Sequence, residues 1–370
     1  MDRAQLSAFT ETVRRFAANE VAPLVGTEGR DGDLDRLPEL FAKAEAVGLV
    51  ASPDPESPGY EYGAWGTMCD DEGPAFSVAI LRELAVACAG FASSVHFAGL
   101  GAREANGLEE VPGRVAVAFF EDAWRPGWDV FALPPDGSAQ LTAGERTTLS
   151  GSKAFVQCPV GCEGFVVYAN GGAQWQKVFV PAGVAGLLVE RLDARTGLAA
   201  LEVLNLTMED VRLEPVGMVH DADLKGMLTR WMLGLAAVAV GNAVGALSAA
   251  RAYAADRYQG GAQIETHPAV RILIGGAAST IDACALSLQA AAEAGGTEDI
   301  LWRACSLKLA VTTDCCRAVS DLLQVLGGYG YMEDYRLEKR LRDAMTLKTM
   351  SVRPDDLRML CADRPQGGQR

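Results

Sequence analysis

The sequence predicts an α+β protein in three parts: a helical N-terminal domain (residues 1–112), a β-rich middle domain (113–217) and a C-terminal helical bundle (218–370). Two changes in the spacing of apolar residues predict this order. The spacing is helical at the start, changes to short β-type runs near Val115, and becomes helical again after Asp221. The third observation is length, because the last region holds three apolar segments of more than twenty residues each, as buried bundle helices do.

The N-terminal region is predicted to be helical because its apolar residues recur at helical spacing. Leu6, Phe9 and Val13 share one face, and residues 37–50 repeat the pattern before a break rich in proline and glycine. Small residues crowd the helix expected at 91–101, which favours close packing against its neighbours.

The middle region is predicted to be a small β-barrel or sandwich. Its short runs begin at Val115–Phe120 and end at Leu187–Val189, and turn sequences such as Asn170–Gly172 separate them. The C-terminal region is predicted to form a bundle core, an oligomer interface or both. Its three long helices are expected at 227–258, 268–294 and 299–326.

Composition argues against several classes of protein. The net charge of −15 over 370 residues leaves no basic field for phosphates, so we expect no nucleic-acid partner. The N-terminus is charged where a secretory signal is apolar, and the run Trp231–Val240 is too short to cross a bilayer, so we expect no membrane span. Nine scattered cysteines favour a cytoplasmic location. Cys158 and Cys162 have no second pair to complete a zinc site, so no metal is predicted.

One stretch, residues 321–356, carries the strongest functional signal. A helical repeat there stops at Gly327-Gly328, and a glycine pair at a helix end leaves amide groups accessible to a phosphate or a planar ligand. Gln324 lies one turn earlier and offers a side-chain amide to the same ligand. The full string, Gln324-Val-Leu-Gly-Gly-Tyr-Gly-Tyr331 followed by Arg342-Asp-Ala344, resembles the C-terminal signature of the acyl-CoA dehydrogenase family.

Further motifs extend this resemblance along nearly the whole chain. They occur in the family's order, and the sequence of α, β and α regions is also that of the family. The resemblance implies FAD extended between the β domain and the C-terminal bundle, with its ADP half reaching a neighbouring subunit. The motifs are Leu149-Ser-Gly-Ser-Lys153, Arg195-Thr-Gly-Leu198, Glu209-Asp-Val211, and the stretch from Tyr253 through Arg257 and Gly261 to His267.

The resemblance implies four residues for the ADP half of FAD. Arg257 is expected to face the diphosphate, and Gln324, Gly327 and Gly328 to receive the adenosine end. These residue types suit the ligand, since a diphosphate is bound well by a fixed cationic fork and by exposed amides. The alternative is that Arg257 is only a solvated residue near a helix end.

The residues implied for the flavin ring depart from the family. A family threonine that contacts the ring is matched by Phe120 at one position and by Gln157 at another. Gln157 can still donate a hydrogen bond to the ring, and Phe155 and Trp124 can stack on it. The alternative is that these side chains fill the space of a flavin.

The catalytic base of the family is missing from both of its known positions. The reaction removes an α-proton from an acyl-CoA thioester, which needs a carboxylate in a dry pocket. Counting from Asp343 places Ser351 at the first position, and Thr229, just before Arg230, is at the second. An alcohol without an activator is no substitute for a carboxylate.

Several interpretations of the missing base remain open. The base comes from another acid, for which Glu61, Glu121, Glu333 and the pair Asp355-Asp356 are candidates by type. Otherwise the protein carries out a different flavin reaction on a CoA ester, or it is a non-catalytic partner of an active homologue. A flavin monooxygenase on the same fold is a further alternative.

The resemblance also implies the substrate and the partners. An acyl-CoA thioester is the expected substrate, with Arg230 and His96 as candidate substrate-binding residues, although a histidine on a helix of small residues is more often a packed core residue. The expected assembly is a homodimer, a homotetramer or a heteromer with a homologous dehydrogenase. Electron-transfer flavoprotein is a candidate redox partner, although the sequence does not identify the electron acceptor.

Overall fold

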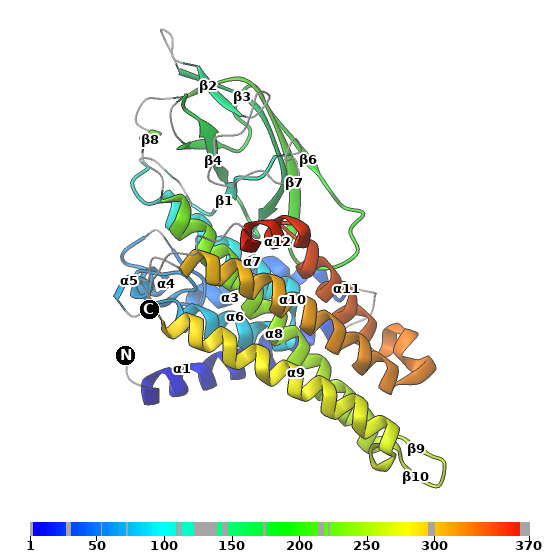
Figure 1. The fold of residues 1–370 in the computed structure, drawn as a ribbon. Coiled ribbons are helices and arrows are strands. Elements are labelled where there is room, and N and C mark those ends of the chain that lie inside the picture. Colours follow the sequence, from blue (N-terminus) through cyan, green and yellow to red (C-terminus); the bar gives the residue numbers. More distant parts are fainter. Residues whose placement is uncertain are drawn as a thin grey trace.

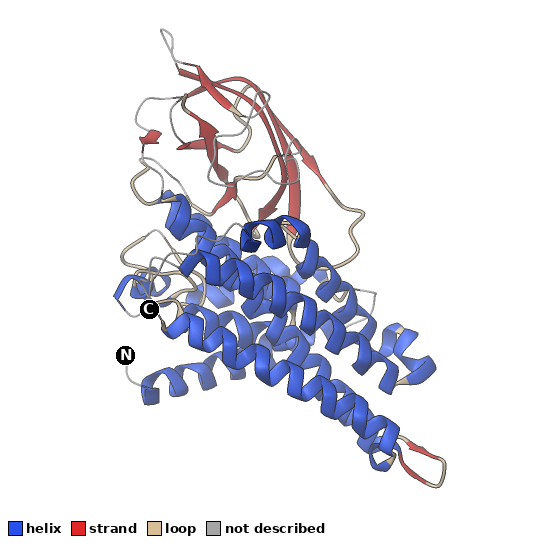
Figure 2. Cartoon of the chain, viewed as in Figure 1, coloured by secondary structure: helices blue, strands red, loops and turns tan. Residues whose placement is uncertain are grey.

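The structure is a computed structural model in which helices at both ends of the chain form one bundle, and a β-sheet stands at one end of it (Figures 1 and 2). The prediction of helices, then strands, then helices is confirmed. The structure describes residues 3–26, 31–52, 54–71, 73–108, 111, 113–121, 139–142, 147–172, 175–213, 218–220, 223–294 and 300–362. Trp124, which was predicted to stack on a flavin, lies outside them.

The N-terminal helices form one side of the bundle. The first helix is amphipathic and continues through a π-helical turn, Ala17–Val21, which keeps Val13, Ala17 and Val21 buried. Ser57 begins a short helix by accepting a hydrogen bond from the Gly59 N–H. The helices are α1 (Arg3–Phe16), α2 (Ala22–Gly26), α3 (Leu37–Ala46), α4 (Pro58–Tyr62), α5 (Met68–Asp71), α6 (Ala75–Ala87) and α7 (Ala89–Ala105).

The middle region is one eight-stranded sheet, in the strand order β6-β7-β3-β2-β4-β5-β8, with β1 paired in parallel to β4. The sequence predicted that this region ends at residue 217. In the structure the sheet continues beyond that residue, because strand β8 pairs with β5. Alternating apolar side chains of the long strands form a separate core inside the curled sheet. The strands are β1 (Val115–Ala118), β2 (Gln140–Thr142), β3 (Thr147–Cys158), β4 (Gly164–Asn170), β5 (Trp175–Pro181), β6 (Leu187–Arg191), β7 (Glu202–Leu213) and β8 (Met218–His220).

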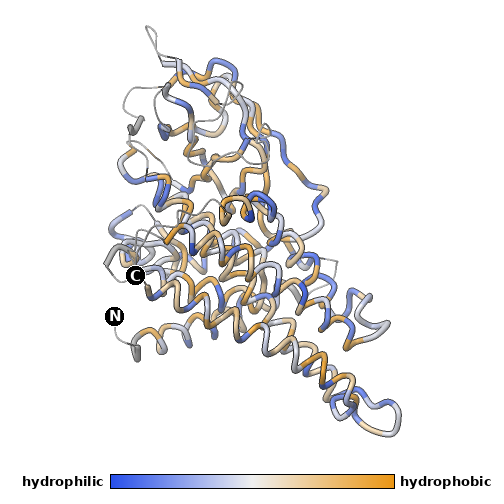
Figure 3. Tube along the Cα trace, viewed as in Figure 1, coloured by the Kyte–Doolittle hydropathy of each residue, from blue (hydrophilic) through white to orange (hydrophobic). Residues whose placement is uncertain are grey.

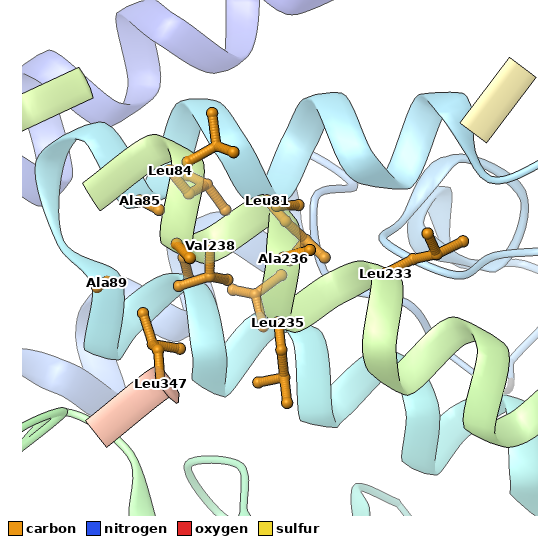
Figure 4. Packing of buried hydrophobic residues seen from close by; sticks show 14 of the residues in the cluster. Leu81, Leu84, Ala85, Ala89, Leu233, Leu235, Ala236, Val238 and Leu347 are labelled. Carbon is orange, nitrogen blue, oxygen red and sulfur yellow. The ribbon is translucent and has the colours of Figure 1, made fainter. Parts of the chain in front are cut away.

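Helix α8 is the central helix of the bundle. It is buried on several sides because it packs against α6, α7, α9, α10 and α11. Figure 4 shows Leu233, Leu235 and Val238 of α8 beside Leu81 and Leu84 of α6. The C-terminal elements are α8 (Leu224–Asp256), a hairpin of β9 (Tyr258–Gln259) and β10 (Ala262–Gln263), α9 (Pro268–Glu293), α10 (Ile300–Val325), α11 (Leu337–Thr349) and α12 (Pro354–Ala362).

Helix α9 leaves an apolar face uncovered. Hydrophobic residues recur along it (Figure 3), and Ile272 and Leu286 are 74% and 68% exposed. A Cβ atom at Gly275 or Gly276 would meet no neighbouring atom. By length and composition alone both α8 and α9 could cross a membrane, but most of the apolar stretch of α8 is buried inside the protein. Such helices are weak evidence for a membrane span, because core and interface helices share the same composition.

Candidate functional site

A cleft of about 830 Å³ lies between the sheet and the C-terminal end of α11. Three segments that are distant in sequence form its walls. They are the end of β1 with the middle of β3, the connection between β6 and β7, and the turn after α11. The residues that line the cleft include Phe120, Glu121, Phe155, Gln157, Arg195, Ser351 and Asp356.

Phe155 and Gln157 form the wall of the cleft that belongs to the sheet. Phe155 has a φ of 51°, which is rare for a bulky residue, and a shift of strand register occurs between Lys153 and Val156. As a result its ring is 57% exposed and lies against the cleft. Gln157 is buried, and its Oε1 atom has no hydrogen-bond partner among the described residues. A strained aromatic beside an unsatisfied amide is typical of a ligand site.

Ser351 forms part of the opposite wall and is fixed by Trp231. The indole Nε1 of Trp231 donates a hydrogen bond to the Ser351 hydroxyl at 2.8 Å, and Ser351 has a φ of 66°. Lys308 donates to the carbonyl oxygens of Lys348 and Val352, at 3.0 and 2.9 Å, and so fixes the turn on both sides of Ser351. Burial lowers the pKa of Lys308 to about 7. No base partners the Ser351 hydroxyl among these contacts.

Two of the candidate acids line the cleft, and both are paired with cations. Oε1 of Glu121 accepts hydrogen bonds from Lys153 Nζ at 2.5 Å and from the Ala139 N–H at 3.2 Å. Its Oε2 atom is buried without a partner among the described residues. Burial lowers the pKa of Lys153, and the carboxylate of Glu121 opposes this shift. Asp356 accepts two hydrogen bonds from Arg353, at 2.7 and 3.0 Å.

The other candidate acids lie elsewhere. Glu61, Glu333 and Asp355 are exposed, and none of them lines the cleft. Thr229, the second position of the family's base, is buried and also does not line it, although its hydroxyl has no partner among the described residues. Among the described residues the cleft therefore contains carboxylates at Glu121 and Asp356 only.

The connection between β6 and β7 is held in place by α11. The carboxylate of Asp343 accepts a hydrogen bond from the Leu198 N–H at 2.6 Å, and its second oxygen accepts from Lys339 at 2.8 Å. Arg342 donates to the Thr196 carbonyl at 2.9 Å. The Arg-Asp-Ala motif therefore lies outside the cleft and holds one of its walls in place through these hydrogen bonds. The sequence motif alone did not indicate this role.

A second pocket, of about 330 Å³, lies at the far end of α8. It brings together Arg257, Gln324 and Gly327, which the sequence predicted to act together. The Arg257 guanidinium lies 5.2 Å from the centre of the Tyr329 ring, and its Nε has no partner among the described residues. Gly327 has a φ of 57°, and a Cβ atom there or at Gly328 would meet nothing, so the backbone is open to a ligand.

The two pockets of one chain are far apart. Trp231 contacts the cleft wall through Ser351, whereas Arg257 follows the last residue of the same continuous helix. Because an α-helix rises by about 1.5 Å per residue, Trp231 and Arg257 lie about 39 Å apart along the helix axis. Figure 1 shows the sheet and the β9–β10 hairpin, which follows Arg257, at opposite ends of the molecule.

The two candidate substrate-binding residues lie outside the cleft. Arg230 Nη2 donates to Glu104 Oε1 at 3.1 Å. His96 is fully buried, and its Nδ1 accepts a hydrogen bond from the Trp65 indole at 2.8 Å. Burial lowers the pKa of His96 to about 3, so the ring is neutral. The structure therefore places Arg230 in a partly buried ion pair with Glu104 and His96 in the core.

Sequence reasoning did not identify Trp231, Lys308 or Asp343 as parts of the site. Trp231 was counted only as a member of an apolar run, and Asp343 only as a member of a matching string. The contact of Trp231 with Ser351 joins residues that are 120 positions apart, so no local pattern indicates it.

Comparison with known proteins agrees with this architecture. The protein-family model for the acyl-CoA dehydrogenase N-terminal domain matches residues 3–111 of this sequence, and the family model for the C-terminal domain matches residues 233–352. The probable acyl-CoA dehydrogenase YngJ of Bacillus subtilis is 26% identical over 91% of this chain and 92% of that protein. A subunit of the caffeyl-CoA reductase-Etf complex of Acetobacterium woodii, CarC, is 27% identical over 58% of this chain and 62% of its own length.

Solved structures show the same fold. The glutaryl-CoA dehydrogenase of Mycobacterium smegmatis in complex with FADH2 superposes with a TM-score of 0.82 over 98% of this chain and 94% of that one, at 16% identity. The chain belongs to the acyl-CoA dehydrogenase family. Members of this family are flavoproteins.

Proposed function

We propose that this chain is an FAD-binding subunit of an acyl-CoA dehydrogenase. Two chains share each flavin, and the reaction removes hydrogen from the CH–CH group of an acyl-CoA thioester. The observation that carries this proposal is the open cleft, in which Phe155 and Gln157 face the family's base position, Ser351. Side chains of the described residues do not fill this space, as they would if the flavin site had been lost.

The residues of both pockets fit FAD. The unsatisfied amide of Gln157 would hold the polar edge of the flavin ring, and the exposed face of Phe155 would stack on it. Arg257, Gln324 and the open backbone at Gly327 would hold the diphosphate and the adenosine end. When bound, FAD supplies the acceptor for the hydride from the β-carbon.

The distance between the pockets supports a flavin shared by two chains. One chain contributes its cleft, and a second chain contributes its Arg257 pocket, since Arg257 lies about 39 Å along the helix axis from Trp231, which stands behind the cleft wall. The uncovered face of α9, with Ile272 and Leu286, supports burial of the C-terminal helices against a second chain. We propose a dimer or tetramer, with electron-transfer flavoprotein as the redox partner, in the cytoplasm. Nine cysteines, none in a disulfide, favour that reducing location.

The protein's own residues have limited means to move the α-proton. Ser351 accepts a hydrogen bond from Trp231, and no described base forms a hydrogen bond with its hydroxyl. Asp356 has both oxygens bound to Arg353, and Glu121 shares one oxygen with Lys153. Both carboxylates are therefore engaged with cations rather than free to approach the α-carbon of a substrate.

This arrangement favours a second candidate function, a non-catalytic subunit in a heteromer. Such a chain lends its Arg257 pocket to the flavin of an active homologue and needs no base of its own. The specific observation in its favour is that neither described carboxylate in the cleft is free of a cation.

Purification of the chain alone, followed by its visible absorption spectrum, tests both functions. A flavin band close to one FAD per chain supports the proposed flavoprotein. A colourless protein that becomes yellow only with a co-expressed homologue supports the partner role instead. A protein that stays colourless with added FAD, and with every homologue tried, contradicts both.

A further inference from the structure

The floor of the cleft, on the side of the helical bundle, is closed by aromatic side chains. Among the described residues that line the cleft, none comes from α6, α7 or α8. We infer that Trp231, together with Phe120, closes the cleft toward the bundle and so restricts the acyl-CoA substrate to short acyl groups. This inference rests on the proposed function and adds a substrate class to it.

Trp231 is held on three sides. Its indole N–H donates to the Ser351 hydroxyl, which anchors the ring behind the cleft wall. The Phe120 ring meets it edge to face at 5.1 Å and 89°, and the Phe97 ring does so at 5.3 Å and 73°. Trp231 is also 0% exposed, so the ring is locked by packing on every side.

The position of this indole matters because of what lies on either side of it. Phe120 and Phe155 belong to the wall where the flavin ring is proposed, and Ser351 marks the family's base position. The reacting carbons of a thioester would lie between these walls. A chain that continues from them toward the bundle meets Phe120 and then Trp231.

Space behind Trp231 is also occupied. Phe97 is packed against His96, and His96 accepts a hydrogen bond from Trp65. A Cβ atom on Gly234, one turn along α8, would collide with the His96 ring. Admitting a long acyl chain would therefore require displacement of Trp231 into a core that has no room for it.

Binding of butyryl-CoA and octanoyl-CoA, measured by isothermal titration calorimetry, tests this restriction. Where a pocket accepts the chain, each additional buried methylene strengthens binding by about fourfold. In the wild-type protein we expect octanoyl-CoA to bind no more tightly than butyryl-CoA. In Trp231→Leu we expect octanoyl-CoA to gain about tenfold or more relative to butyryl-CoA.

Phe76→Leu is the matched control. Phe76 is a buried aromatic of α6 that stacks on Phe9 at 4.1 Å and does not line the cleft. Its replacement should disturb the core to a similar degree and leave the ratio of the octanoyl-CoA affinity to the butyryl-CoA affinity unchanged. If Trp231→Leu does not fold, this affinity ratio in the wild-type protein decides the question by itself.

The outcomes separate this inference from the proposed function. Octanoyl-CoA binding at least tenfold more tightly than butyryl-CoA to the wild-type protein overturns the closed floor but leaves the acyl-CoA function intact. Failure of butyryl-CoA, octanoyl-CoA and free CoA to bind to a flavin-loaded protein overturns the proposed acyl-CoA function, and the inference with it.

Discussion

The two pockets at opposite ends of α8 differ in how closely they keep to the family's pattern. The pocket around Arg257 has the cation, the amide and the glycines that a dinucleotide diphosphate needs, and its backbone is open. The cleft beside the sheet has open space, but it carries Phe120, Gln157 and Ser351 at positions where the resemblance to the family implies hydroxyl and carboxylate groups. On that resemblance, binding features are retained and reacting groups are replaced.

This difference follows from what each pocket has to do. Diphosphate recognition depends on charge and exposed amides, so few substitutions preserve it. A cleft can keep its volume while its reactive side chains change, since shape depends on the fold and on contacts such as Asp343 with Leu198. A chain with one intact pocket and one altered cleft is therefore suited to an assembly in which chains share sites.

The largest expected effect comes from restoring a carboxylate in the altered cleft. In flavin-loaded Ser351→Glu, oxidation of butyryl-CoA should rise by about 100-fold or more over the wild type, because a positioned general base contributes about that factor. Dye reduction under anaerobic conditions measures this rate. Ser351→Gln has the same size without a basic oxygen, and equal rates for the two variants would show that the cleft lacks more than its base.

The next effect tests the retained pocket. Arg257→Ala should weaken FAD binding by about 30-fold, since a charge-assisted hydrogen bond to phosphate contributes about 2 kcal/mol. Fluorescence titration of the apoprotein with FAD measures the change. Arg251→Ala removes an exposed arginine from the last turns of α8, just before Arg257, and should bind FAD as the wild type does. Equal affinities for the two variants would remove Arg257 from the site.

A smaller effect concerns the core behind the cleft. His96 stays neutral in the folded protein because burial lowers its pKa to about 3, whereas the unfolded chain titrates near 6.5. The unfolded state binds more protons below pH 6.5, so stability is lost as pH falls toward 3. Protonation of His96 in the unfolded chain should therefore lower the free energy of unfolding by about 2 kcal/mol from pH 7 to pH 5.

Urea denaturation at the two pH values measures the drop. His267→Gln should keep it, because His267 lies near the surface beside Gln259. His96→Gln should abolish it. An equal drop in both variants would mean that other groups cause the acid sensitivity.

Much of the fold was predictable from residue spacing. The helical and β periodicities are local, and they placed the long helices within a few residues of α8, α9 and α10. The pocket around Arg257 was also predictable, because Gln324 and Gly327 lie close together in a recognisable string. The strand that ends at His220 was assigned to the next region, since three residues carry no periodicity.

The cleft was harder to predict because its contacts join distant segments. The hydrogen bond from Trp231 to Ser351 spans 120 residues, and that from Leu198 to Asp343 spans 145. Nothing local marks either pair. Arg230 and His96 were assigned from their positions in family strings, whereas ion pairing and burial determine where these side chains lie.

The central claim, that one flavin is held by the cleft of one chain and the Arg257 pocket of another, has a direct test. Gln157→Ala and Arg257→Ala chains, carrying different affinity tags, are purified separately and as a co-expressed mixed dimer. Sharing predicts little bound FAD in each variant alone and about half the wild-type FAD per chain in the mixed dimer, because one of its two sites is intact. A mixed dimer with no more FAD than the separate variants would contradict the claim.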